Sequence, residues 1–388
     1  MRKLIFVFLN ILIWKFAIAQ KEVTVFESGK EGYASFRIPS VIKLPNYKIL
    51  AFAEGRVNGG ADFGNIKIVL KTSHDHGKTW SVMKVIASYS QWQVGNAAPV
   101  VDVLDPEYPN GKIYLFYNTG NVSEMELRQG KGLREVWYIS SVDEGTSWSE
   151  PVNITSQVHF PNGEREGRKY SNEKDWRTYA NTPGHATQCM DGKYKGRIYI
   201  SANHSEGAPK ANFKDYYSHG YYTDDHGKTF KLSASLNIAG SNEATAAFIS
   251  NDRLIMNVRN QPGDIKSRIV AYSNDGGEGF EAAKYDTSLP DPVCEGALLN
   301  IGNRKGKSIL AFVNAADKAH RNNLTLKISY DEGISWPIHQ LIDGTKDLVL
   351  AKKDFTAYAD LIKMGRRKVG VFYEKENYTK MVFKRVKW

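Results

Sequence analysis

The sequence predicts an all-β fold, a six-bladed β-propeller with four-stranded antiparallel blades. Three observations lead to this expectation: a short turn pattern that recurs five times, strand-like runs around each copy, and a C-terminal remainder that has strand-like runs but no copy of the pattern. Repeated four-stranded sheets arranged in a ring bury each sheet face against its neighbours and leave few open edges.

The recurring pattern reads Ser/Thr-x-Asp-x-Gly-x-x-aromatic. Its five copies occupy residues 73–80, 141–148, 223–230, 273–280 and 329–336. Asp accepts hydrogen bonds from backbone amides within a turn, Gly supplies a positive φ, and the aromatic side chain packs beneath the turn. Each copy follows an apolar, β-branched or aromatic run, which predicts a strand, a turn and a second strand. We therefore expect these copies to stabilise the fold and to lie away from any substrate.

The remaining residues predict a sixth blade and one irregular stretch. Residues 355–388 contain three strand-like runs, and the run from Glu22 to Phe26 supplies a fourth, so that both ends of the chain close the ring. The polar stretch from Thr155 to Asn181 does not fit the blade pattern. It is either a solvated linker or a long loop at the mouth of an active site, since loops longer than about 12–15 residues are often functional.

The first twenty residues are typical of an export signal. Two basic residues precede the apolar stretch from Leu4 to Trp14, and the small-residue site Ala17-Ile18-Ala19 follows. The apolar stretch is short for a membrane span, and Lys15 interrupts it, so an uncleaved anchor is the less favoured alternative. We expect a signal peptide over 1–19, one catalytic domain over 20–388, and a periplasmic or extracellular location.

Composition restricts the partners. The two cysteines, Cys189 and Cys294, are too few for a disulfide framework or a cysteine-based zinc site, and we expect no metal or cofactor. The formal charge of +10 suits an anionic partner. Basic residues are spread along the sequence, which argues against nucleic acid. After the leader, no apolar run approaches about 18 residues, so stable membrane insertion is not expected. We also expect the protein to be a monomer.

The segment Phe36-Arg37-Ile38-Pro39, together with the five turns, resembles the sialidase (neuraminidase) superfamily, in which the turn pattern is called the Asp box. The resemblance spans almost the whole chain after the leader. The Arg-Ile-Pro motif is its more specific part, because Asp boxes also occur in other propellers and glycan-binding proteins. The resemblance implies an exo-alpha-sialidase that removes terminal sialic acid from glycoproteins, glycolipids or oligosaccharides.

The resemblance implies five substrate-binding residues. Arg37, Arg259 and Arg321 match the three arginines that hold the sialic acid carboxylate, and the planar guanidinium suits a carboxylate because it binds in a bidentate way. Arg56 matches an arginine on the side of the sugar's 4-hydroxyl group. Asn96 stands where some bacterial relatives have an aspartate, so the contacts to the 4-hydroxyl and N-acetyl groups are expected to differ in detail.

The resemblance also implies the catalytic residues. Tyr358 matches the nucleophile, and a neutral phenol avoids the repulsion that a carboxylate nucleophile would meet at the substrate's own carboxylate. Because a phenol has a pKa near 10, Glu243 is expected to act as its base. Asp62 matches the acid/base residue, and Glu374 matches the carboxylate that supports Arg37. Three further residues are expected to be structural neighbours of the pocket: Glu54, His185 and Asp360.

The sequence features admit three alternative functions. A non-catalytic glycan-binding propeller is expected to lack Tyr358, Glu243 or Asp62, and all three are present. A trans-sialidase transfers the sugar to another glycan, and that activity often accompanies an added lectin-like domain. An enzyme acting on another 2-keto acid sugar remains open, because the same arginines would hold its carboxylate.

Overall fold

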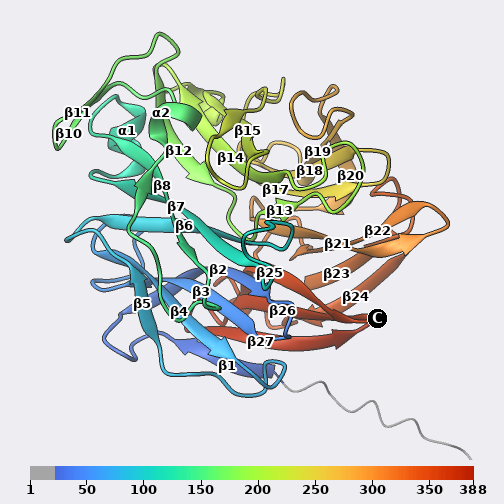
Figure 1. Ribbon diagram of the computed structural model, residues 1–388. Helices are drawn as coiled ribbons and strands as arrows, with labels where there is room; N and C mark the ends of the chain where they lie inside the picture. The colour runs from blue at the N-terminus through green and yellow to red at the C-terminus, as the bar shows by residue number, and fades with distance from the viewer. Residues whose placement is uncertain (1–21) are drawn as a thin grey trace, which may run out of the picture.

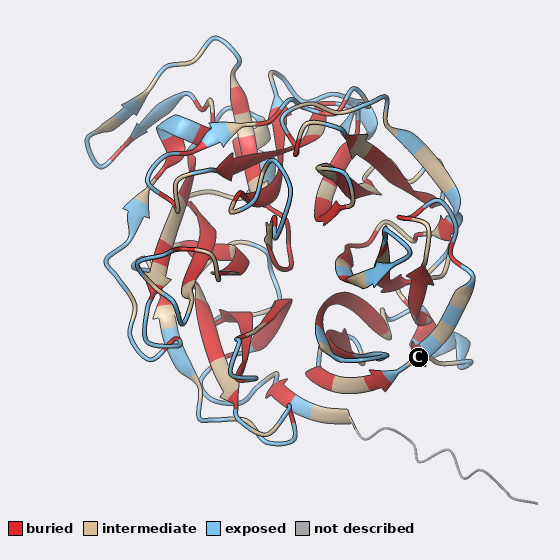
Figure 2. Ribbon diagram, turned by 45° about the vertical axis from the view of Figure 1, so that its right-hand side comes forward, coloured by how far each residue is buried: buried red, intermediate tan, exposed pale blue. Residues whose placement is uncertain are grey.

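The structure, a computed structural model, describes residues 22–388, and the expected signal peptide lies outside them. Strands dominate, and they form sheets arranged around a common centre (Figures 1 and 2). Short helices lie in connections between strands: α1 (Glu124–Arg128), α2 (Thr155–Val158), α3 (Leu348–Ala351) and a 3-10 turn (Ala211–Phe213). None of the helices in the described part is long and apolar enough to span a bilayer.

Three sheets contain four antiparallel strands each. One consists of β1 (Glu22–Glu27), β27 (Lys380–Lys387), β26 (Lys368–Lys375) and β25 (Thr356–Gly365). A second consists of β17 (Ser241–Ile249), β18 (Arg253–Asn260), β19 (Ser267–Ser273) and β20 (Lys284–Pro290). The third consists of β21 (Gly296–Arg304), β22 (Lys307–Ala315), β23 (Leu324–Ser329) and β24 (Ile338–Asp343).

Two larger sheets complete the ring. One has five strands: β12 (Trp176–Asn181), β13 (Thr187–Gln188), β14 (Ile198–Glu206), β15 (Tyr216–Thr223) and β16 (Lys231–Leu232). The other has eight: β2 (Ser35–Lys43), β3 (Ile49–Arg56), β4 (Ile66–Ser73), β5 (Lys84–Ala87), β6 (Gln93–Asp102), β7 (Lys112–Gly120), β8 (Arg134–Ser141) and β9 (Val152–Asn153). A parallel pair, Ile66 with Gln93, joins β4 to β6 within it.

The expectation of an all-β propeller is confirmed, whereas the division into six separate four-stranded sheets is confirmed only in part. The hydrogen bonds between β4 and β6 merge strands that the repeat pattern assigned to two blades. The closure of the ring is confirmed: β1 pairs antiparallel with β27, with Val23 opposite Phe383. Residues from both ends of the described chain therefore share one sheet.

All five Asp boxes form the expected turn. In the second copy, Asp143 accepts hydrogen bonds from the Ser141 hydroxyl (2.8 Å) and from the amides of Thr146 (3.1 Å) and Ser147 (2.9 Å). The Ser141 hydroxyl in turn accepts a hydrogen bond from the Gly145 amide at 2.9 Å. The same serine or threonine contacts recur in the other four copies.

The aromatic residue that ends an Asp box packs against the preceding group of strands. The Trp80 ring lies 5.4 Å from the Phe383 ring of β27, and the Trp148 ring lies 6.2 Å from the Phe52 ring of β3, both centroid to centroid. Aromatic pairs at such separations contribute roughly 0.5–1.5 kcal/mol beyond the area they bury. The boxes therefore connect neighbouring strand groups as well as form turns.

The stretch from Thr155 to Asn181 is more structured than the sequence suggested. It contains α2, a two-stranded ribbon of β10 (Gly163–Arg165) and β11 (Arg168–Tyr170) that projects from the ring, and β12 (Figure 1). The interpretation that this stretch lies outside the blades is wrong for β12, which pairs with β14. The strand was not predicted because Trp176 and Tyr179 are its only large apolar residues and many charged residues precede it.

Candidate active site

A cavity of about 380 Å³ lies where the strands nearest the centre begin. Eight of the nine predicted site residues line it: Arg37, Arg56, Asp62, Asn96, Glu243, Arg259, Arg321 and Tyr358. The ninth, Glu374, lies fully buried behind Arg37. The volume falls within the range of about 300–1,000 Å³ that is typical of small-molecule sites. The fold thus brings together residues separated by more than 300 positions in the sequence.

β-Bulges orient the side chains at this end of the central strands. The pairing register shifts between Arg37 and Ser40 in β2, Gly95 and Ala98 in β6, Ser241 and Ala244 in β17, and Thr356 and Ala359 in β25. A bulge bends its strand and redirects a side chain, and bulges are common beside active sites. Arg37, Asn96, Glu243 and Tyr358 all lie at these shifts, which explains how side chains from four strands converge on one cavity.

Tyr358 lies at the centre of a hydrogen-bonded trio. Its hydroxyl donates to Glu243 Oε1 at 2.6 Å, while Arg259 Nη1 donates to the Tyr358 hydroxyl and to Glu243 Oε2, both at 2.7 Å. Burial raises the pKa of Tyr358 well above its usual value and Glu243 adds to this shift, against the opposing effect of Arg259 and Arg321. The phenol is therefore protonated, and its proton points at a carboxylate.

Glu374 connects the first arginine to the strand that carries Tyr358. Its carboxylate accepts hydrogen bonds from Arg37 Nε (2.7 Å) and from the backbone amides of Ile38 (2.9 Å) and Tyr358 (3.2 Å). Burial opposes the charge of Arg37, but the carboxylate of Glu374 outweighs this effect and raises the pKa of Arg37. One buried carboxylate thus fixes both a guanidinium and the backbone at the tyrosine.

Tyr378, which the sequence analysis did not identify, links two of the arginines. The Arg37 guanidinium carbon lies 3.9 Å from the centroid of the Tyr378 ring, and Arg321 Nη1 donates a hydrogen bond to the Tyr378 hydroxyl at 3.0 Å. The guanidinium carbons of Arg37 and Arg321 also lie 5.5 and 5.4 Å from the centroid of the Tyr358 ring. Together with Arg259, they surround the tyrosine with three positive charges.

Asp62 lies at the rim of the cavity, on the loop between β3 and β4. Its side chain is 77% exposed, and its Oδ1 lies 2.7 Å from Arg56 Nη1. Although partial burial opposes the shift, Arg56 and then Arg37 lower the pKa of Asp62, with a smaller effect from Arg321. In this state Asp62 is an ionised carboxylate paired with Arg56.

Glu54 is part of the site rather than a mere neighbour. Its Oε2 accepts a hydrogen bond from Arg56 Nη2 at 2.7 Å, and its Oε1 accepts one from the Asn96 backbone amide at 2.9 Å. A Cβ atom at Gly95 would lie 2.2 Å from Glu54 Oε1, so a residue without a side chain is needed there. Glu54 therefore positions both Arg56 and the bulge that carries Asn96.

Further residues of the cavity had no distinguishing sequence signal. Arg134 is buried and lines the cavity; its Nη1 donates to the Tyr179 carbonyl at 3.2 Å, and its Nε has no partner within the described part of the chain. Glu295 lies behind Tyr358, where its Oε2 accepts from the Ala359 amide at 2.9 Å, and burial raises its pKa well above the usual range. Arg134 and Glu295 could be found only from the way the strands of the propeller pack around the cavity.

Other titratable groups lie away from the cavity lining. His185 Nδ1 is 2.6 Å from Asp360 Oδ1, and neither residue lines the cavity, in agreement with the expectation that both are structural. Asp102, Asp105 and His226 are close enough together to hold a metal ion, but Asp102 already contacts His226 Nδ1 at 2.7 Å. Both cysteines are buried and unpaired.

The fold and the cavity define a β-propeller whose site combines an arginine cluster with a tyrosine–glutamate pair. The chain belongs to the family described as BNR repeat-like domain, which matches residues 47–371.

Individual relatives agree with this assignment. A sialidase of Bacteroides fragilis is 28% identical over 94% of this chain, and an exo-alpha-sialidase of Aspergillus fumigatus is 27% identical over 89%. The chain spans 64% of the length of the former and 80% of the latter. Among solved structures, the Hadza microbial sialidase Hz136 superposes with a TM-score of 0.76 at 23% identity, covering 94% of this chain and 68% of that one.

Proposed function

We propose that the protein is an exo-alpha-sialidase, a glycoside hydrolase that releases terminal sialic acid from glycoproteins, glycolipids or oligosaccharides. The observation that carries the proposal is the hydrogen-bonded pair of Tyr358 and Glu243 beside three arginines. A substrate that bears a carboxylate on the carbon where the bond breaks needs both features. The arginines bind the carboxylate, and the neutral phenol attacks without charge repulsion.

Binding uses groups that the fold already holds in place. The guanidinium groups of Arg37, Arg259 and Arg321 bind the carboxylate, and two of them are fixed by buried or part-buried partners, Glu374 and Glu243. Preorganised side chains lose little entropy when the ligand binds. Arg56 and Asn96 also line the cavity, and in the complex they contact the sugar's 4-hydroxyl and N-acyl substituents.

Catalysis proceeds in two displacements with balanced proton transfers. The Tyr358 oxygen attacks the anomeric carbon and passes its proton to Glu243, while Asp62 protonates the departing glycosidic oxygen as that bond breaks. Water then attacks the same carbon, Asp62 accepts the water's proton, and the phenol leaves with the proton that returns from Glu243. Two inversions give net retention at the anomeric carbon.

The ion pair of Asp62 with Arg56 describes the resting state. An ionised Asp62 is not an acid, so substrate must change its environment. The incoming carboxylate places a negative charge beside Arg37 and Arg321, two of the groups that lower the pKa of Asp62. We infer that binding raises the pKa of Asp62 and produces the protonated form that the first step needs.

We also propose that the ring has six blades, with β2–β5 and β6–β9 as two blades of the eight-stranded sheet. Each of these groups is antiparallel within itself and carries its own Asp box. The sheet of β25, β26, β27 and β1 lacks a box because the box joins third and fourth strands, and here these belong to opposite ends of the chain. A single exported domain over residues 20–388 that acts as a monomer completes the proposal.

The test is a release assay on α2,3-, α2,6- and α2,8-linked sialosides, with the first-formed anomer followed by proton NMR. We expect free sialic acid, initially as the α anomer. Initial β anomer would contradict the double displacement. Binding without release would identify a non-catalytic propeller, and a product joined to added lactose in preference to water would identify a trans-sialidase.

A further inference from the structure

A second cavity, of about 700 Å³, lies between the turns of two β-hairpins. One turn connects β21 to β22 and the other connects β25 to β26, and the C-terminal Trp388 also lines the cavity. Five cationic side chains contribute to its wall: Arg304, Lys363, Arg366, Arg367 and Lys368. All five are exposed, and we refer to them and the cavity they line as the basic groove.

The charge of the basic groove is not neutralised by the protein. Its lining contains no aspartate or glutamate side chain, and within residues 22–388 none of the five cations forms an ion pair. The catalytic cavity differs, because there Arg37, Arg56 and Arg259 each contact a glutamate. Gathering five like charges without acids concentrates positive potential, which attracts anions. Four of the five cations already lie within residues 363–368, and the fold adds Arg304 from the other hairpin.

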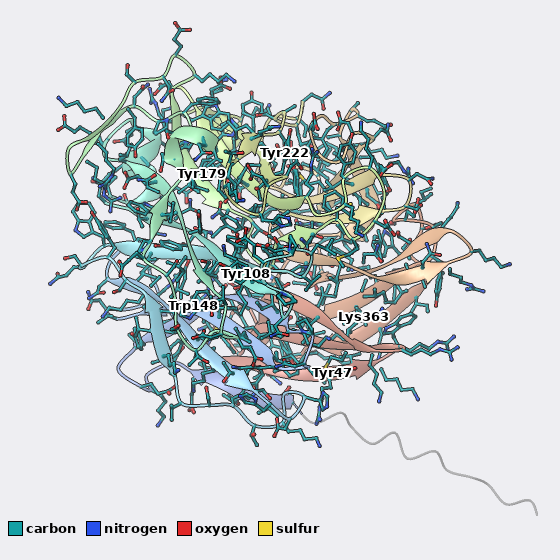
Figure 3. All side chains as sticks on the ribbon, in the orientation of Figure 1. Tyr47, Tyr108, Trp148, Tyr179, Tyr222 and Lys363 are labelled. Carbon is teal, nitrogen blue, oxygen red and sulfur yellow. The ribbon has the colours of Figure 1, made fainter. Side chains whose placement is uncertain are left out.

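The basic groove is separate from the catalytic cavity. Both Tyr358 and Lys363 belong to β25, but they lie five residues apart toward opposite ends of the strand, or about 16 Å at the usual rise of about 3.3 Å per residue. In Figure 3, Lys363 lies well apart from Tyr179, which lines the catalytic cavity. A ligand in the groove therefore leaves the catalytic cavity free.

Aromatic rings and an adjoining cavity give the groove its shape. The rings of Tyr330 and Trp388 lie 6.3 Å apart, and the Arg304 guanidinium carbon lies 5.2 Å from the Tyr330 centroid. A third cavity shares Lys363 with the groove and adds Lys43, whose pKa burial and Lys363 both lower. The third cavity therefore adjoins the groove and adds one further cation, although its lining also includes Asp191.

We propose that the basic groove is a second, non-catalytic binding site for an anionic glycan, a sugar chain that carries carboxylate or sulfate groups. Arginine side chains bind such groups through paired hydrogen bonds, and the aromatic rings offer flat surfaces for sugar rings. The charge lies in a groove whose lining includes the rings of Tyr330 and Trp388, and not on an amphipathic helix or a broad basic face. This arrangement favours a glycan over a bilayer or a nucleic acid duplex. The inference stands on its own, whatever the catalytic cavity hydrolyses.

The test uses a chondroitin sulfate tetrasaccharide, which contains no sialic acid and so avoids the catalytic cavity. Isothermal titration at low and high salt measures its affinity for the full chain and for the triple variant R304Q/R366Q/R367Q. The matched control, K78Q/K228Q/K231Q, also removes three positive charges, but from exposed positions away from the groove. Release of sialic acid from a small soluble substrate and the melting temperature report whether each variant is folded.

We expect binding that weakens as salt rises, a loss of at least 30-fold in the groove variant, and a change below about 3-fold in the control. Both variants should keep the melting temperature and the release rate of the parent protein. No binding by the parent, or equal losses in the two variants, would overturn the proposal. Tighter, groove-dependent binding of a DNA duplex or of phosphatidylserine vesicles would overturn the assignment to a glycan.

Discussion

Replacing Glu374 by Gln should destabilise the protein and lower the catalytic activity of the fraction that stays folded. The fully buried carboxylate accepts hydrogen bonds from Arg37, Ile38 and Tyr358, and the Arg37 side chain is only 10% exposed. Removing one partner of a buried ion pair costs about 3–5 kcal/mol, and the remaining amide oxygen recovers part of this, so we expect a loss of about 2–4 kcal/mol. For a chain of this length, that loss lowers Tm by about 3–5 °C.

Urea unfolding of the parent protein, of each single variant and of the double variant measures this effect. The control is Glu376→Gln, which removes a carboxylate that pairs with Lys380 near the surface, where an ion pair is worth about 1 kcal/mol or less. The double variant Arg37→Met/Glu374→Gln should lose less stability than the sum of the two single losses. Either single substitution already removes the ion pair, so the second one cannot remove it again. Equal losses for Glu374→Gln and Glu376→Gln, or strict additivity in the cycle, would refute the reasoning.

Three further outcomes are expected. Asp143→Ala removes the acceptor of an exposed Asp-box turn, so unfolding free energy should fall by about 1–2 kcal/mol while kcat/KM of the folded protein is unchanged; a selective loss of turnover would contradict this. If substrate raises the pKa of Asp62, the alkaline limb of kcat should lie at higher pH than that of kcat/KM, and coincident limbs would count against it. Burial lowers the pKa values of His159, His204 and His219, the last to about 3, so these three side chains bind more protons in the unfolded than in the folded chain below about pH 6.5. Although burial opposes the shift, Asp360 raises the pKa of His185, which offsets part of their effect. The contribution of His159, His204 and His219 to the free energy of unfolding should therefore be fully present above pH 7 and decline as pH falls toward 4. A constant urea midpoint over that range would contradict this prediction.

The sequence predicted the parts of the fold that depend on local chemistry. Asp, Gly and an aromatic at fixed spacing form a turn for reasons contained within eight residues, so each Asp box was located correctly. The pairing of β1 with β27 was also predictable, because the first strand-like run had no blade of its own and the last three runs lacked a fourth strand. The β12 strand was missed because its neighbours are charged, and its place in a sheet depends on β14.

The site divides in the same way. Residues in distinctive local motifs, such as Arg37 and Tyr358, were identified, and the structure brings them to one cavity. Tyr378, Arg134 and Glu295 lie in ordinary strands and turns, and they matter only because of what packs against them. The bulges that direct the site side chains likewise depend on register between strands, which no single strand's sequence records.

The central claim is that Tyr358 is the nucleophile. A fluorinated sialic acid donor slows the second displacement and allows a covalent intermediate to accumulate, which peptide mass spectrometry can locate. The account predicts a label on the peptide that contains Tyr358, and neither a label nor more than residual turnover in Tyr358→Phe, in which the ring and its packing remain. A label on any other residue, or full activity in Tyr358→Phe, would contradict the account.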